Sequence, residues 1–183
     1  QLKPDSRFLD IGAHYGYFTL IATAILDDRG EIYAYEPAKS SNRLLKANTE
    51  RMENVKTFPL AVSNSDQDKL FYEFSNLHSE YNSMDMAQFE HEHWYQQNKP
   101  EVVTVKATTI DTITQSSGFK PDMIKIDVEG AEHEVIEGGI RYFQANAPQI
   151  IMEEVAPDRK NDTHKIAFDR LIGLGFRSYR IGD

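Results

Sequence analysis

Residues 8–18 read Phe-Leu-Asp-Ile-Gly-Ala-His-Tyr-Gly-Tyr-Phe, and the fold is decided in this stretch. An apolar run typical of a buried strand gives way to a turn with Gly12 and Gly16, after which apolar residues take helical spacing. Glycine lets the backbone approach a ligand without a Cβ clash, and the helix that follows directs its N-terminus toward that ligand. The stretch predicts a strand-turn-helix unit that binds a nucleotide-like molecule.

The next indication of a binding site lies at the end of a second predicted strand. Residues 31–36 read Glu-Ile-Tyr-Ala-Tyr-Glu, and Pro37 then stops the strand. An acidic residue at this place can accept hydrogen bonds from both hydroxyls of a ribose. We therefore expect Glu36 to bind ribose, with Pro37 beside it.

The glycine spacing separates the classes of nucleotide. A dinucleotide-binding turn has the pattern G-x-G-x-x-G, whereas residues 12–16 read Gly-Ala-His-Tyr-Gly. The chain also lacks the G-x-x-x-x-G-K-[ST] pattern that holds a phosphate chain. A nucleoside without phosphates is the expected ligand, and a nicotinamide or flavin cofactor is disfavoured.

A third motif, residues 124–132, reads Ile-Lys-Ile-Asp-Val-Glu-Gly-Ala-Glu. Asp127 and Glu129 lie two residues apart at the end of a predicted strand, so both can project into the crevice outside the sheet. Lys125 lies within the apolar strand and needs a partner, which Glu153 or Glu154 on the next predicted strand can supply.

The remaining pattern predicts an α/β fold. Strand-like runs at 7–11, 32–35, 55–60, 123–128 and 150–154 alternate with helical patterns at 17–26, 40–51, 131–143 and 164–174. This alternation is typical of a doubly wound, Rossmann-like, mainly parallel sheet. Ser40 or Ser41 is expected to cap the second helix.

Two regions depart from the alternation. Residues 63–107 hold two strand-like runs, 70–74 and 102–106, separated by a long polar stretch, which indicates an inserted hairpin and loop. Near the carboxyl end, 177–181 is followed by only two residues. We expect one domain over 1–183 whose last strand was removed, and the missing initiator methionine also suggests an excised piece.

Composition excludes several classes of function. The chain has 183 residues, a formal net charge of −9 and no cysteine. The charge argues against a nucleic-acid partner, and the lack of cysteine excludes disulfides, thiolate metal sites and a cysteine nucleophile. No apolar run reaches the roughly 18 residues of a membrane span, so a cytoplasmic protein without a membrane span is expected. The sequence does not indicate the oligomeric state.

Together, the glycine turn, Tyr35-Glu-Pro37 and residues 124–132 resemble the FkbM-type family of S-adenosylmethionine-dependent methyltransferases, with the likeness running from about Phe8 to Glu154. The resemblance implies S-adenosylmethionine as cofactor and a hydroxyl oxygen of a small molecule or glycan as methyl acceptor. It also places the insert, around residues 76–83, near the substrate. Methylation of nitrogen or carbon, and a binding or scaffold domain without activity, stay open as alternatives.

The resemblance implies roles for particular residues. The methionine part of the cofactor is expected beside Asp10, Gly12, Ala13, Gly16 and Tyr17. Ala61 and Val62, following Leu60, would offer apolar surface to adenine, with Ser63 or Asn64 for its ring nitrogens.

The acceptor side is expected at the third motif. Asp127 would bind the cofactor's ammonium or position the acceptor, and Glu129 would be the general base, with His133 one helical turn further on. An ordinary surface role for His133, and a helix-dipole role for Glu129, stay open. No metal is expected, although Asp127, Glu129 and Glu154 are a less favoured possibility for a divalent ion, as His91 and His93 are for a ligand pair.

Overall fold

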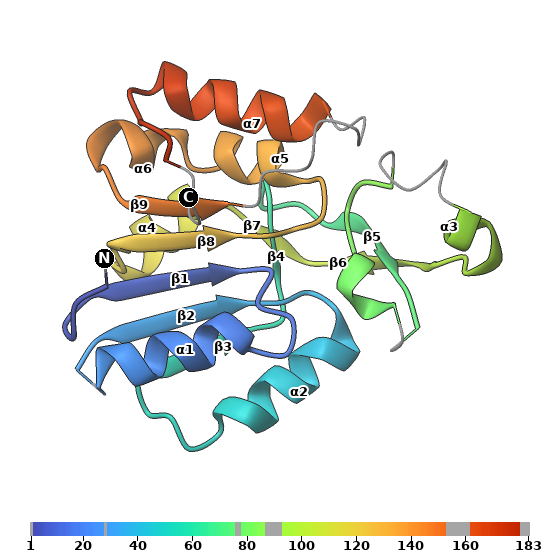
Figure 1. Cartoon of the computed structure of the whole chain (residues 1–183), viewed down its shortest axis with the longest axis horizontal. Coiled ribbons are helices and arrows are strands. Elements are labelled where there is room, and N and C mark those ends of the chain that lie inside the picture. Colours follow the sequence, from blue (N-terminus) through green and yellow to red (C-terminus); the bar gives the residue numbers. More distant parts are fainter. Residues whose placement is uncertain (1, 28, 76–77, 87–92, 153–161, 180–183) are drawn as a thin grey trace.

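Five parallel strands make the central sheet. The computed structural model describes residues 2–27, 29–75, 78–86, 93–152 and 162–179. The strands are β1 (Arg7–Ile11), β2 (Glu31–Tyr35), β3 (Val55–Phe58), β8 (Met123–Ile126) and β9 (Gln149–Met152). Their spatial order is β3-β2-β1-β8-β9 (Figure 1). The order reverses between β1 and β8, and such a switch point opens a crevice at the carboxyl ends of the strands.

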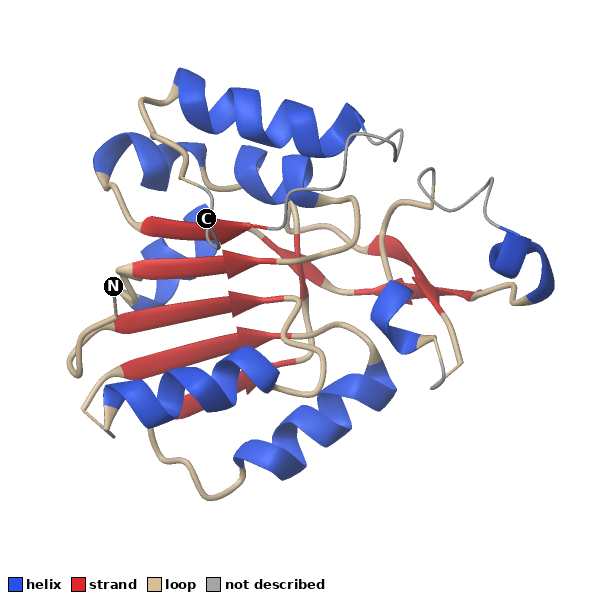
Figure 2. Ribbon diagram, in the orientation of Figure 1, coloured by secondary structure: helices blue, strands red, loops and turns tan. Residues whose placement is uncertain are grey.

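Helices cover both faces of this sheet (Figure 2). One face packs on α1 (Tyr17–Leu26) and α2 (Lys39–Thr49), where Phe8 meets Ala22 and Leu26. The other face packs on α4 (Ile110–Ser117), α5 (Glu132–Glu137), α6 (Ile140–Ala145) and α7 (Asp162–Gly173). The predicted doubly wound, Rossmann-like α/β fold is therefore confirmed.

Successive residues of β1 explain why both faces can be filled. Leu9 and Ile11 belong to the core beneath α4–α7, whereas Phe8 packs on the α1 side. Side chains alternate between the faces of a strand, so a strand buried on both sides must be apolar almost throughout. Asp10, fully buried, is the exception on β1, and its partners belong to the site described below.

Some predicted boundaries were wrong. The single helix predicted over 131–143 is two helices that are separated by Gly138 and Gly139. A Cβ on Gly138 would lie 2.0 Å from the backbone oxygen of Ser63, so that position requires glycine. The strand over 55–60 ends at Phe58, and Ala61–Val62 forms a separate strand, β4. Neither Ser40 nor Ser41 caps α2; its N-cap is Ala38, and the Ser40 hydroxyl donates to Glu73 instead.

The insert is anchored at both of its ends. Strand β4 pairs in parallel with β7 (Ala107–Thr108), and β5 (Lys69–Glu73) pairs antiparallel with β6 (Glu101–Val105) as the predicted hairpin. The short 3-10 helix η1 (Ser79–Tyr81) and helix α3 (His93–Gln97) lie between β5 and β6 in the sequence. Helix α4, capped by Thr109, follows immediately and was not predicted. Near the carboxyl end, residues 177–179 are not in a strand, and 180–183 lie outside the described residues.

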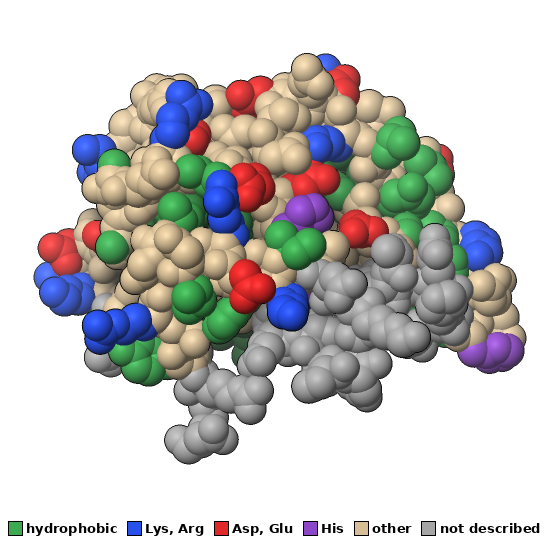
Figure 3. Space-filling model, turned by 90° about the horizontal axis from the view of Figure 1, so that it is seen from above, with side chains coloured by type: hydrophobic (Ala, Val, Ile, Leu, Met, Phe, Trp, Pro, Cys, Tyr) green, Lys and Arg blue, Asp and Glu red, His purple; other side chains and the backbone are tan. Residues whose placement is uncertain are grey.

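The face seen from above, with α7 toward the viewer, mixes apolar and charged side chains (Figure 3). The exposed large apolar residues of α7 are Ile166, Phe168 and Ile172. Within the described ranges, no helix combines the length and apolar character needed to cross a bilayer.

Candidate active site

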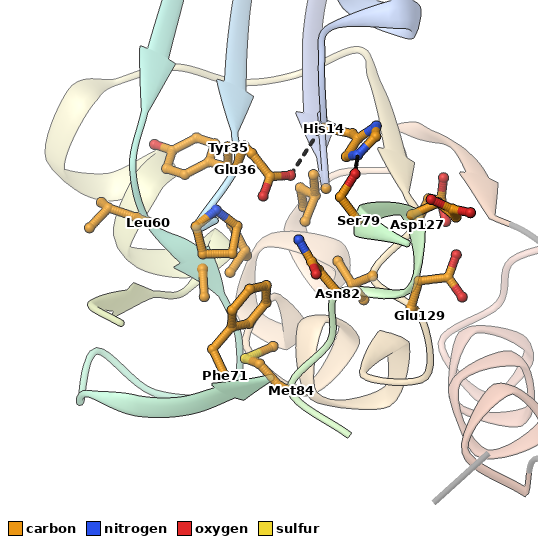
Figure 4. A pocket seen from close by; sticks show the side chains of 17 residues that line it. His14, Tyr35, Glu36, Leu60, Phe71, Ser79, Asn82, Met84, Asp127 and Glu129 are labelled. Atoms are coloured by element: carbon orange, nitrogen blue, oxygen red, sulfur yellow. Dashed lines mark hydrogen bonds between the residues drawn. The ribbon is translucent and has the colours of Figure 1, made fainter. Parts of the chain in front are cut away.

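A cavity opens at the carboxyl ends of β1, β2 and β8, where the strand order reverses (Figure 4). Loops that follow the sheet strands contribute Gly12, His14, Glu36, Pro37, Asp127 and Glu129. The segment after β3 contributes Leu60, Ala61 and Val62. The insert contributes Phe71, Ser79, Glu80, Asn82 and Met84. The sheet therefore supplies one side of the cavity and the insert supplies the other.

The turn after β1 requires glycine because another backbone segment of the protein lies against it. Gly12 has a φ of 74°, and a Cβ there would lie 1.8 Å from the backbone oxygen of Asp127. Gly16 has a φ of 94° and is the N-cap of α1. The two loops that follow β1 and β8 can therefore pack together only with glycine at position 12, in addition to any need for close approach by a ligand.

Glu36 is almost completely buried at the end of β2. One carboxylate oxygen accepts the amide of His14 at 2.8 Å and the other accepts the amide of Ala38 at 2.9 Å. Burial raises the pKa of Glu36 to about 7, although these two amides and the charge of Lys125 act in the opposite direction. Each oxygen keeps lone-pair capacity, so the carboxylate, when ionised, can accept two further hydroxyl hydrogens.

Lys125 lies between two carboxylates rather than beside the predicted Glu153 or Glu154, which lie outside the described residues. Its Nζ is 3.3 Å from Asp10 and 3.4 Å from Asp127, and it donates to the backbone oxygen of Gly12 at 2.6 Å. Asp10 also accepts the hydroxyl of Thr19 at 2.6 Å. The register pairs Asp10 directly with Lys125 across β1 and β8, which explains this choice of partner. The ammonium ties the glycine turn to the end of β8.

The loop after β8 is held by an internal carboxylate and by the insert. Glu132, 1% exposed, accepts the backbone amides of Val128 and Gly130. Glu129 has a φ of 53°, an uncommon conformation for a non-glycine residue, and its backbone oxygen accepts the Ser83 hydroxyl at 2.6 Å. These contacts fix the backbone from which Asp127 and Glu129 reach the cavity.

The insert also bonds to the glycine turn. The hydroxyl of Ser79 lies 3.1 Å from the His14 ring and 2.6 Å from the Tyr15 hydroxyl. Burial lowers the pKa of His14, so its ring is neutral at pH 7 and can share a hydrogen bond without carrying charge. Ser79 and Ser83 thus link the insert to the loops after β1 and β8.

The residues proposed from sequence fall into two groups. Seven line the cavity, namely Gly12, Glu36, Pro37, Ala61, Val62, Asp127 and Glu129. Five are not among the described lining residues: Asp10, Ala13, Gly16, Tyr17 and His133. Asp10 lies behind the cavity beside Lys125, and Tyr17 is 69% exposed. Ser63 donates its hydroxyl to Glu134 and Asn64 accepts from Lys69, and neither is among the described residues that line the cavity.

Several lining residues were not predicted individually. His14 was given no role, and Phe71 was predicted only as part of a strand. The resemblance placed residues 76–83, which include Asn82, near the substrate as a stretch and not residue by residue. Met84 had no signal beyond the length of the insert.

Within the described ranges, no group of three or more His, Cys, Asp or Glu side chains is arranged to hold a metal ion. Glu154 and His91, which belonged to the two less favoured ligand sets, lie outside those ranges.

The chain is similar in fold to several solved structures that are named as methyltransferases or methylases. The FkbM methyltransferase from Methylobacillus flagellatus is 12% identical with a TM-score of 0.62, and the match covers 95% of this chain and 38% of that one. The precorrin-6y C5,15-methyltransferase from Geobacter metallireducens is 17% identical with a TM-score of 0.53, covering 96% and 64%. The putative rRNA methylase from Clostridium thermocellum is 7% identical with a TM-score of 0.52, covering 94% and 73%. At such low identity the likeness shows the fold, and the chain spans less than two thirds of the first two proteins.

The sequence comparisons concern the family. No curated protein sequence matches this chain significantly. The model of the methyltransferase FkbM domain, in contrast, matches residues 10–178, which include all three motifs and the insert. The chain therefore belongs to the FkbM methyltransferase family.

Proposed function

We propose that this chain binds S-adenosylmethionine and transfers its methyl group to a hydroxyl oxygen of a small molecule or glycan. The observation that carries the cofactor proposal is the buried carboxylate of Glu36. Each of its oxygens already accepts one backbone amide, which fixes the carboxylate while leaving both oxygens able to accept ribose hydroxyls. The choice of an oxygen acceptor rests on the likeness to FkbM-type enzymes.

The rest of the cavity fits the parts of this cofactor. The backbone around Gly12 and the carboxylate of Asp127 would hold the methionine part, and Pro37, Ala61 and Val62 would contact adenine. Asp10, although it does not line the cavity, would act through Lys125, which bonds to Gly12. When bound, S-adenosylmethionine would supply a methyl group activated by a positively charged sulfur.

The chain itself must orient the acceptor and take up its proton. Methyl transfer is an in-line displacement, so the acceptor oxygen must be aligned by residues around the cavity. Asp127 and Glu129 both line the cavity. The Lys125 ammonium lies 3.4 Å from Asp127 and holds that carboxylate in place, so we assign a positioning role to Asp127. From the likeness to FkbM-type enzymes, we assign the general base to Glu129. His133 is not among the lining residues and is a weaker candidate.

The insert, residues 63–107, would form the acceptor side of the cavity within a single domain. Its residues Phe71 and Met84 lie across the cavity from the sheet-end loops (Figure 4), and Glu80 also lines the cavity. An acceptor bound between the insert and the loop after β8 would meet Glu129. This arrangement supports the placement of the insert near the substrate.

Calorimetric titration with S-adenosylhomocysteine tests the ribose assignment. Glu36→Gln should lower the affinity about tenfold or more, because a neutral amide cannot accept from both hydroxyls. Glu31→Gln, at the other end of the same strand, is the matched control and should bind like the wild type. Equal affinity of the Glu36 variant and the control would contradict the assignment.

The base assignment needs a separate readout. Once an acceptor is found by screening hydroxyl compounds for methyl uptake, Glu129→Gln should lower kcat by about 10²–10⁴-fold while leaving S-adenosylhomocysteine affinity unchanged. Full turnover by this variant would show that another group takes the proton.

A further inference from the structure

Asn82, in the insert, is held in one orientation. Its Oδ1 accepts the backbone amide of Phe74 at 2.7 Å, which fixes the oxygen end of the side-chain amide. The next residue, Ser83, donates its hydroxyl to Glu129 and pairs its backbone with Tyr72. The Asn82 amide cannot turn over without losing the bond to Phe74, so its nitrogen faces away from the insert backbone.

That nitrogen is a buried donor without a partner. Of the described buried side-chain atoms that lack a hydrogen-bond partner, Nδ2 of Asn82 is the one that belongs to a residue lining the cavity. Figure 4 shows the amide directed into the cavity, on the opposite side from Glu36. Buried donors are almost always paired in native proteins, so a bound ligand is expected to supply the acceptor.

The charged side chains of the cavity indicate which atoms of a ligand Asn82 would bind. The charged side chains that line it are carboxylates, from Glu36, Glu80, Asp127 and Glu129. When ionised, carboxylates accept hydrogen bonds, so they suit hydroxyl and ammonium groups of a ligand but not its lone pairs. A ring nitrogen with a lone pair needs a donor such as Asn82.

Apolar side chains in the same cavity favour a flat heterocycle. Phe71 and Met84 line the cavity from the insert, and Leu60 lines it from the segment after β3 (Figure 4). Adenine combines an apolar ring face with three ring nitrogens that accept hydrogen bonds, and burying those nitrogens without donors would be unfavourable.

We propose that Asn82 determines specificity for the cofactor's base by donating a hydrogen bond from Nδ2 to a ring nitrogen of adenine. This rests on the proposed function, since it takes an adenosyl cofactor as the ligand. It adds a residue from the insert to the adenine contacts expected at residues 60–62.

The test combines a change in the protein with a change in the base. Wild type and Asn82→Asp would be titrated with S-adenosylhomocysteine and its 1-deaza, 3-deaza and 7-deaza analogues, each of which replaces one ring nitrogen by CH. Asp keeps an oxygen for the Phe74 amide and removes the donor. Asn82→Ala removes the donor without adding charge, and Asn48→Asp, on α2 with its amide bonded to Tyr15, adds the same charge elsewhere.

One deaza analogue should bind wild type and Asn48→Asp about fivefold more weakly than S-adenosylhomocysteine. In Asn82→Asp and Asn82→Ala that difference should disappear. A ratio of affinities is unaffected by general damage to the insert. Unchanged ratios for all three analogues would overturn the role of Asn82 while leaving the proposed function standing. Failure of the wild type to bind S-adenosylhomocysteine at all would instead overturn the proposed function, and this inference with it.

Discussion

The parallel sheet and the insert, residues 63–107, form opposite sides of one cavity but are stabilised differently. The sheet has continuous ladders of backbone hydrogen bonds and apolar side chains buried on both faces. The insert meets the sheet-end loops through single polar contacts, chiefly from Ser79 and Ser83. Contacts of that kind contribute about 1 kcal/mol each, so the insert side can be altered without unfolding the sheet. Changes on the sheet side should therefore affect stability far more than changes on the insert side.

The largest effect is expected where the two sheet-end loops touch. Gly12→Ala should lower the free energy of unfolding by more than about 5 kcal/mol, because its Cβ would overlap the Asp127 backbone. Gly118→Ala is the control: its φ is also positive, at 68°, but nothing lies within 4 Å of the added Cβ. It should cost only about 1–2 kcal/mol of conformational strain. Urea unfolding compares them, and similar losses would contradict the close approach.

The buried ion pairs of the sheet should come next. Lys125→Met leaves Asp10 and Asp127 without their ammonium and should cost about 3–5 kcal/mol. Lys56→Met removes a solvent-exposed pair with Glu31 and should cost less than about 1 kcal/mol. Chemical denaturation measures both. If Lys125→Met lowered the free energy of unfolding as little as Lys56→Met does, the contacts of Lys125 between β1 and β8 would not stabilise the fold.

Glu36 should make cofactor affinity depend on pH. Ribose hydroxyls donate to the ionised carboxylate, and a pKa of about 7 leaves the carboxyl mostly protonated at pH 6. S-adenosylhomocysteine affinity should therefore fall about tenfold between pH 8 and pH 6. Glu36→Gln should lack this dependence. Calorimetry between pH 6 and pH 8 measures this affinity. A wild-type affinity that does not change with pH would contradict either the raised pKa of Glu36 or its contact with ribose.

The smallest effect is expected from the insert. Ser79→Ala removes its bonds to His14 and Tyr15 and should cost about 1 kcal/mol. Ser116→Ala, whose exposed hydroxyl bonds only within α4, is the control and should stay within about 0.5 kcal/mol of the wild type. Thermal unfolding measures the difference. A loss from Ser79→Ala as large as that from Lys125→Met would remove the distinction between sheet and insert.

The sheet and the insert also differ in how much of each could be predicted from the sequence. Strand β1 and helix α1 were predicted with their observed bounds, because their apolar spacing records burial on a regular element. The placement of Glu36 beside the cavity followed from its position at a strand end. The resemblance placed residues 76–83 near the substrate, but Asn82 and Ser79 could not be singled out within that stretch, because irregular segments have no period and their contacts join residues far apart in the chain. The close approach of Ser63 to Gly138, at the break between α5 and α6, also joins residues far apart in the chain and left no local signal.

The central claim is that this cavity holds an adenosyl cofactor rather than a dinucleotide. Calorimetric titration of the wild-type chain at pH 8, with S-adenosylhomocysteine and NAD in parallel, tests it most directly. We predict one-site binding of S-adenosylhomocysteine and no measurable binding of NAD. Binding of NAD, or of neither compound, would contradict the claim.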